Sequence, residues 1–294
     1  MKRIMALMAT ICCLISGIQA QELPKDELSV YLLGGFTQLR HGNAFTSEGK
    51  LGGGGGLSYA SPISLHWDVI GGLELLSYHS AVNVDSLSSS AERMYNDGGR
   101  IESEYYRAQI AGYAEQQHIT YLQVPLMVRY KIQVAGDHKF YAAAGIKVGY
   151  SIITHYNSTI AKLTTTRYFP DTEEEFLPDM SNHGIGVFSN QSTKGSMAFK
   201  TGNISATLEI GMRWRISQRM SLYTGVFFDY GLWETGPRQS ETNLPLVTYD
   251  DANNTLLYNS MLSSKNQESN TLYVDKLGLL AVGLKISLAF SGLY

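Results

Sequence analysis

Cysteine is almost absent from this chain of 294 residues, which contains only Cys12 and Cys13. Both lie in residues 1–20, where two basic residues, an apolar core and a small-residue end form the pattern of a secretory signal peptide. The residues before each cysteine lack the usual pattern of a lipidation site. We therefore expect an exported domain, residues 21–294, that has no thiol. The absence of a thiol from this domain excludes disulfides, thiolate catalysis and cysteine metal sites.

Long apolar runs and basic tracts are also missing. After residue 20 no run approaches 18 apolar residues, so we expect no membrane-spanning helix. The formal charge is −3, and loss of Lys2 and Arg3 with the signal would make it −5 (−3 − 2). Such an acidic chain, without clustered basic residues, offers nucleic acid no binding surface. The seven histidines lack the spacing of metal ligands, and we expect no cofactor.

The sequence does contain strict alternation of apolar and other residues. A β-strand sends successive side chains to opposite faces, so a period of two predicts a strand with one greasy face. The clearest case is the segment 280–290, in which one face consists of Leu280, Val282, Leu284, Ile286, Leu288 and Phe290. The eight predicted strands are 28–38, 51–60, 64–79, 119–132, 140–153, 203–216, 220–232 and 276–290.

The connections between these strands alternate in length. Short turns are expected at 61–63, 134–137 and 217–219, and long polar segments at 39–50, 80–118, 154–202 and 233–275. This order predicts an all-β fold, an eight-stranded antiparallel up-and-down transmembrane β-barrel in the outer membrane, with long extracellular loops. The segments 80–118 and 154–202 are also compatible with strands that continue above the membrane, or with a further hairpin.

Two short features interrupt the strand pattern. Five consecutive glycines, residues 52–56, lack the Lys and Ser or Thr that a phosphate loop requires, so we expect a curved strand that makes room for bulky lumen neighbours. Pro125 cannot donate to a strand ladder, and we expect a local bulge around it.

The predicted inner faces carry four acidic and four basic residues. Unpaired charges would be costly in a narrow interior, so we expect a neutralised network that plugs the barrel. The alternative is a small gated pore or proton path. The predicted network consists of Asp68, Glu74, Arg129, Lys147, Glu209, Arg213, Asp229 and Lys285.

Three segments resemble a known family. Residues 121–131 (YLQVPLMVRYK), 140–145 (FYAAAG) and the alternating end 283–290 resemble the PorT-like, OmpA-like outer-membrane β-barrel family of Bacteroidetes. The resemblance implies a small outer-membrane barrel and transfers no catalytic residues. The family's founding member is linked to a protein-secretion apparatus, which makes a secretion or assembly role a second hypothesis.

The sequence favours a non-enzymatic barrel that anchors loops for envelope structure or binding. A third hypothesis is a hydrolase at the outer rim, acting on lipid A through His155 and Ser158 or on peptides through Asp and His pairs. Expected partners are outer-membrane lipid, lipopolysaccharide and the barrel-insertion machinery, with envelope or secretion proteins as further candidates. Loop aromatics suited to a partner are Tyr105, Tyr106, Tyr156, Phe169 and Phe176. The predicted insertion signal consists of Gly283, Ile286, Leu288 and Phe290.

Overall fold

Eight long antiparallel strands form the frame of the molecule. The computed structural model describes residues 24–41, 45–97, 100–176, 181–197, 202–232 and 244–292, so the predicted signal peptide lies outside the described residues. The eight strands are β1 (Glu27–Arg40), β2 (Ser47–Pro62), β3 (Trp67–Asp97), β4 (Arg100–Ala135), β5 (His138–Phe169), β8 (Gly202–Arg215), β9 (Met220–Gly231) and β14 (Gly278–Ser291). In the described part of the chain, no helix is long and apolar enough to span a membrane.

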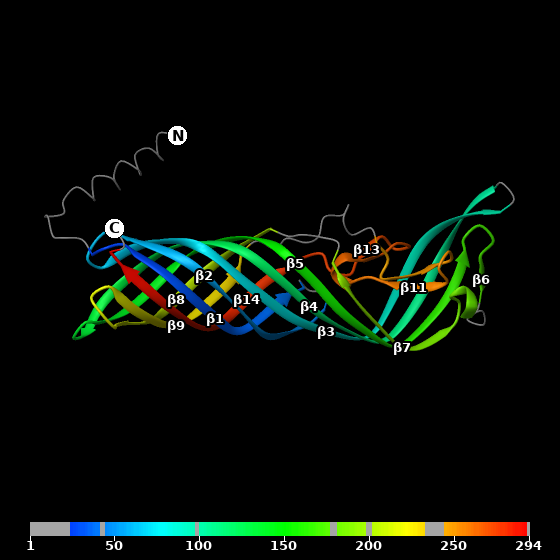
Figure 1. The fold of residues 1–294 in the computed structure, drawn as a ribbon. Coiled ribbons are helices and arrows are strands. Elements are labelled where there is room, and N and C mark those ends of the chain that lie inside the picture. The colour runs from blue at the N-terminus through cyan, green and yellow to red at the C-terminus, as the bar shows by residue number, and fades with distance from the viewer. Residues whose placement is uncertain are drawn as a thin grey trace, which may run out of the picture.

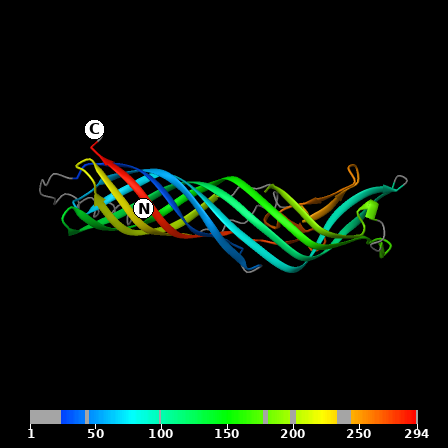
Figure 2. The same cartoon turned by 60° about the horizontal axis from the view of Figure 1, so that its bottom comes forward.

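These strands close into a barrel. Each of the eight pairs with its neighbours in the order β4-β3-β2-β1-β14-β9-β8-β5, and β4 also pairs with β5, which completes the ring. Closure of β1 against β14 sets Leu28 opposite Phe290 and Phe36 opposite Val282. Figures 1 and 2 show the strands tilted around a common axis. The predicted eight-stranded barrel is confirmed.

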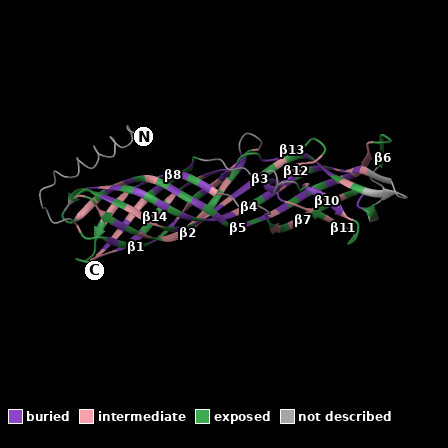
Figure 3. Ribbon diagram, turned by 90° about the horizontal axis from the view of Figure 1, so that it is seen from above, coloured by how far each residue is buried: buried purple, intermediate pink, exposed green. Residues whose placement is uncertain are grey.

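Alternating burial shows which side of the wall meets lipid. On β1 and β14, Leu32 and Leu284 are 71% and 66% exposed, whereas Tyr31 and Ala281 are buried. Figure 3 shows this alternation as short coloured bands along the strands. Because a closed ring leaves no unpaired backbone edge, the apolar exterior can lie in hydrocarbon.

Three strands continue far beyond the barrel, so the predicted ends are wrong and the alternative, that 80–118 and 154–202 extend the strands above the membrane, is confirmed for most of 80–118 and part of 154–202. The ends were expected at residue 79 for β3, 119 for β4 and 153 for β5, but β3 reaches Asp97, β4 begins at Arg100 and β5 ends at Phe169. Most of 80–118 and part of 154–202 therefore form a paired ribbon rather than loops. The sequence pattern weakens there because water, rather than lipid, meets one face of the ribbon.

The ribbon and the segments packed on it form what we call the external lobe, the described residues of 80–118, 154–197 and 244–275. Figure 1 shows the lobe extending from one end of the barrel. Its apolar core is continuous with the barrel interior and includes Tyr106, Ile110, Leu163, Val247 and Met261. Its smaller elements are β6 (Glu174–Phe176), η1 (Ser181–His183), β7 (Val187–Ser196), β10 (Val247–Asp250), β11 (Thr255–Tyr258), η2 (Met261–Ser263), β12 (Lys265–Asn266) and β13 (Thr271–Leu272).

The glycine run and the proline are accommodated differently. A Cβ at Gly56 would lie 2.6 Å from the Tyr31 hydroxyl, so glycine here admits a bulky lumen side chain, as expected. The prediction of a bulge at Pro125 is wrong. The β3–β4 register stays constant across Pro125, and the ladder has a gap between the pairs Gly71–Leu126 and Glu74–Gln123, since proline has no N–H to donate.

Candidate functional site: a filled lumen and an external lobe

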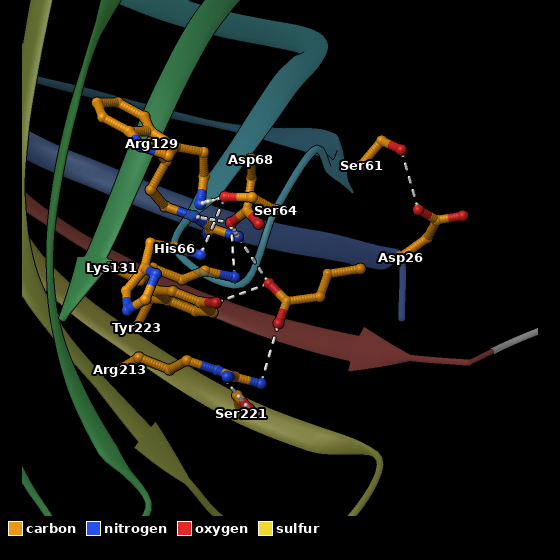
Figure 4. A network of polar contacts seen from close by, with 12 residues as sticks. Asp26, Ser61, Ser64, His66, Asp68, Arg129, Lys131, Arg213, Ser221 and Tyr223 are labelled. Atoms are coloured by element: carbon orange, nitrogen blue, oxygen red, sulfur yellow. Dashed lines mark hydrogen bonds and ion pairs between the residues drawn. The ribbon is translucent and has the colours of Figure 1, made fainter. Parts of the chain in front are cut away.

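The end of the lumen beside the short turns is filled by charged groups from four strands and a tyrosine hydroxyl from a fifth. The carboxylate of Glu27 accepts hydrogen bonds from Arg129 and from the Tyr223 hydroxyl, at 2.8 and 2.6 Å, and pairs with Arg213 at 3.0 Å. Asp68 lies 2.7 Å from the Arg129 guanidinium and 2.8 Å from the Lys131 ammonium. Figure 4 shows these side chains converging inside the wall. Each buried charge therefore has an opposite partner.

A second cluster lies deeper in the barrel. The Lys147 ammonium sits between two buried carboxylates, 2.6 Å from Glu74 and 2.7 Å from Asp229. The Tyr31 hydroxyl donates to Glu74 at 3.0 Å. Beside this cluster, Lys285 contacts Glu209 at 2.8 Å. The Tyr141 hydroxyl donates to the same carboxylate at 2.6 Å.

The residual space among these groups is very small. A cavity of about 10 Å³ is lined by residues including Glu74, Lys147, Glu209 and Lys285. A volume of that size holds one water molecule at most. An eight-stranded ring has an interior just wide enough for side chains to fill. The lumen is therefore filled at this level rather than open.

The structure brings all eight of the predicted lumen charges into these clusters. The sequence interpretation omitted two further charged residues, Glu27 and Lys131. Glu27 lies one residue before the predicted first strand. Lys131 lies on the inner face of the predicted fourth strand but was not included in the predicted network. Three lumen tyrosines were also omitted, because tyrosine suits both a membrane interface and a lumen. Those tyrosines are Tyr31, Tyr141 and Tyr223.

The external lobe is held together by a buried carboxylate. Glu115 on β4 accepts hydrogen bonds from Tyr113, Gln117 and Ser260 side chains at 2.5–2.8 Å and from the backbone N–H of Met261 at 2.9 Å. Burial raises the pKa of Glu115, and these donors act in the opposite direction. Since Ser260 and Met261 belong to the segment 244–275, Glu115 ties that segment to the ribbon.

The hydrogen bonds of Glu115 extend through Gln117 to His41, directly after the end of β1. The Gln117 amide nitrogen donates to Glu115, and its oxygen lies 2.8 Å from Nε2 of His41. The imidazole Nδ1 is buried and has no hydrogen-bond partner among the described residues. Burial lowers the pKa of His41 to about 4, which keeps the ring neutral at pH 7. A neutral ring donating through Nε2 satisfies this geometry.

Ion pairs fasten the far end of the lobe. Arg167 pairs with Asp251 at 3.0 Å, and Arg93 contacts the same carboxylate. Arg107 on β4 makes a two-point contact with Glu268 through Nε and a second guanidinium nitrogen. These pairs join the ribbon to the segment 244–275 a second time. They are partly exposed, so each stabilises the contact modestly.

Three histidines that are distant in sequence lie in one row on the outer face. His79, His118 and His155 are in register on β3, β4 and β5, and Ser196 on β7 continues the row. This alignment depends on strand register, which the sequence spacing did not reveal. No group of three or more His, Cys, Asp or Glu among the described residues is arranged to hold a metal ion.

The structure does not pair His155 with Ser158, the serine expected from the sequence. Ser158 is buried, with its side chain on the opposite face of β5 from exposed His155. Nδ1 of His155 instead lies 3.2 Å from the Ser196 hydroxyl. Among the described residues, no carboxylate hydrogen-bonds His155. The pair thus lacks the acid that orients a catalytic histidine.

Two of the loop aromatics expected to contact a partner serve the lobe's own packing. Tyr106 and Tyr156 are buried, and their hydroxyls donate to the carbonyls of Gly184 and Tyr258. Tyr105, Phe169 and Phe176 remain at least partly accessible. The predicted insertion signal lies on β14, where Ile286 is 57% exposed and Leu288 and Phe290 are half-buried. Gly283 lies against the backbone of Gly34 on β1.

A protein-family match agrees with this architecture. Residues 19–232 match the family described as outer membrane protein beta-barrel domain. No curated protein matches the sequence. The crystal structure of Ail, the attachment invasion locus protein of Yersinia pestis, is similar with 11% identity and a TM-score of 0.32. The match covers 90% of this chain and 99% of Ail. The outer membrane protease OmpT from Escherichia coli is similar with 7% identity and a TM-score of 0.30. That match covers 94% of this chain and 99% of OmpT.

Proposed function

This chain belongs to the outer membrane protein β-barrel domain family and lies in the outer membrane, and from that premise we propose that it is a non-enzymatic anchor for its external lobe. The lobe would present a fixed surface to molecules outside the cell or to neighbouring envelope proteins. The observation that carries the proposal is the packing of 244–275 on the ribbon through buried residues such as Leu246, Val247, Met261 and Leu262, which makes the lobe a packed body rather than free loops.

The filled lumen supports this proposal. Paired carboxylates and cations occupy the level where a transport path would have to pass, and the space between them holds one water molecule at most. A function at the external surface needs no such path. A surface function also accounts for the length of β3, β4 and β5, which exceeds the 9–11 residues that a tilted strand needs to cross the membrane.

Photo-crosslinking in intact cells tests the proposal. A photoreactive residue would replace Met94 or Val187, which are 75% and 53% exposed on the lobe. A matched control would replace Leu284, which is 66% exposed within the lipid-facing band. We expect the lobe positions to yield a discrete protein adduct and the control to yield lipid. Adducts with lipid alone at both lobe positions would contradict the proposal.

Contact between His155 and Ser196 favours a hydrolase as the second candidate. Ser196→Ala and His155→Ala would abolish release of acyl chains from lipopolysaccharide by the purified protein if the pair were catalytic. We expect no release from the unchanged protein, because the pair lacks an orienting acid. The secretion role implied by the PorT-like resemblance is tested by deleting the gene and measuring export of other proteins while the envelope stays intact.

A further inference from the structure

A cavity lined mostly by polar residue types lies on the outer face of the wall. Four adjacent strands place His79, His118, His155 and Ser196 in one row, and the next row outward contains Gln116, Asn157 and Lys194. The rings of His79 and His118 have centroids 4.3 Å apart, and those of His118 and His155 are 6.4 Å apart. Together with Lys50 these side chains line a cavity of about 820 Å³, which we call the interfacial cavity.

The lining of the interfacial cavity favours an anion. It contains two lysines and three histidines, and none of the described residues that line it is a carboxylate. Neither Lys50 nor Lys194 forms an ion pair with the described residues. In the lumen, by contrast, cations such as Lys147 and Arg129 are matched by acids. The lining of the interfacial cavity therefore differs from the lumen in carrying positive charge without a facing carboxylate.

The histidines also retain hydrogen-bonding capacity. Nδ1 of His79 contacts the Leu51 carbonyl at 2.7 Å, and Nε2 of His118 contacts the Thr120 hydroxyl at 3.1 Å. His155 uses Nδ1 for Ser196. Among the described residues, each ring thus uses one nitrogen within the chain. The hydroxyls of Thr120 and Ser196 can donate to His118 and His155, so the other nitrogen of each of these two rings can donate to an acceptor such as a phosphate oxygen. His79 donates to a carbonyl, so its other nitrogen donates only when the ring is protonated.

The position of the cavity along the strands indicates which layer of the membrane surrounds it. The lipid-facing series ends at Leu75 on β3, Leu122 on β4 and Ile153 on β5, each at least 42% exposed. His79 and His118 lie four residues farther out, and His155 lies two residues farther out. At about 3.3 Å per residue and a strand tilt near 40°, this is a rise of about 5–10 Å above the hydrocarbon edge. At this height an outer-membrane barrel meets the polar headgroups of the outer leaflet.

We propose that the interfacial cavity binds the phosphorylated headgroup of an outer-leaflet glycolipid. Lys50, Lys194 and the histidine row would contact the phosphate, and the amides of Gln116 and Asn157 would hydrogen-bond sugar hydroxyls. Charge complementarity and the position at the headgroup level favour this ligand over a protein. This inference needs the outer-membrane location alone, and is independent of a partner for the lobe.

The test uses the full-length barrel in nanodiscs and follows binding of lipid A by native mass spectrometry. We compare the unchanged protein with a Lys50→Gln/Lys194→Gln variant. Lys162→Gln is the matched control, because Lys162 is an exposed lysine on the same ribbon, outside the cavity. We expect the double variant to lose about tenfold in affinity, as two charge-assisted contacts are removed, and the control to lose nothing.

Three ligands distinguish the source of the phosphate. We expect bisphosphorylated lipid A to bind, and dephosphorylated lipid A and inorganic phosphate to bind at least tenfold more weakly. Equal binding of phosphorylated and dephosphorylated lipid A overturns the proposal, as does equal affinity of the double variant. Tight binding of inorganic phosphate assigns the cavity to a soluble anion and also overturns it. Should the double variant fail to fold, Asn157→Asp, which adds a carboxylate to the cavity, must weaken binding instead.

Discussion

The carboxylate of Glu115 accepts the backbone N–H of Met261 at 2.9 Å, across 146 residues of sequence. This contact is buried, and it joins the ribbon to the segment 244–275. Glu115→Ala would leave the Met261 N–H and the Ser260 hydroxyl without an acceptor. Because an unsatisfied buried donor costs about 1–3 kcal/mol, we expect the docked segment to lose about 2–4 kcal/mol.

Hydrogen exchange of the purified barrel measures this loss directly. Faster exchange should be confined to 244–275 and the facing part of β4, while the barrel strands stay protected. Glu268→Gln is the control, since it weakens only the partly exposed pair with Arg107 and should cost less than about 1 kcal/mol. Unchanged exchange in Glu115→Ala would show that other contacts hold the segment.

Acidification should weaken the contact at His41. Burial lowers the pKa of this imidazole to about 4, so the folded state binds the proton more weakly than the unfolded state, whose pKa is near 6.5. The contribution of neutral His41 to the free energy of unfolding is complete above pH 6.5. It is lost as the pH falls to about 4, up to a limit of about 3 kcal/mol. Glu115 opposes this trend, because its raised pKa makes the folded state take up a proton in the acid range.

His41→Gln separates the two contributions, because it removes the titrating group and retains a donor for Gln117. We expect the protection of residues 37–41 and of β4 near Gln117 to fall from pH 7 to pH 4.5 in the unchanged protein and to fall less in His41→Gln. His183→Gln, at an exposed position, should behave like the unchanged protein. Identical pH profiles for all three proteins would contradict the role of His41.

Removal of Lys147 should destabilise the barrel. Lys147→Met leaves Glu74 and Asp229 as two buried carboxylates without their cation, and loss of one partner of a buried pair costs about 3–5 kcal/mol. Urea unfolding in lipid vesicles measures this change. Arg215→Gln is the control: its pair with Asp137 is exposed, and its loss should cost about 0–1 kcal/mol. Equal midpoints for the two variants would mean that the lumen cluster contributes little.

Ion conduction should be very small. The side chains around the cavity of about 10 Å³ leave no continuous water path at that level, so planar bilayers containing the purified protein should show no large, steady single-channel steps. A small-residue variant, Tyr31→Ala with Tyr141→Ala, should increase conductance by widening the lumen. A large conductance in the unchanged protein would contradict the filled lumen.

Strand alternation and the alternating lengths of the connections determined the barrel. Leu280 to Phe290, and the equivalent series on most of the other predicted strands, can bury their apolar face in lipid only if the strands close, because closure leaves no unpaired backbone edge. The same parity assigned Asp68, Lys147 and Glu209 to the interior, because every second side chain of a strand must point there.

Only the tertiary structure decided which of these residues meet. Glu27 and Arg129 are 102 residues apart, and their contact depends on the order of strands around the ring. The row of His79, His118 and His155 depends on register across three strands, which local sequence does not encode. Continuation of the strands above the membrane was an open alternative, but the packing of the external lobe was not predicted. Its apolar residues are covered by a distant segment of the chain, so their pattern carries no regular lipid-facing period.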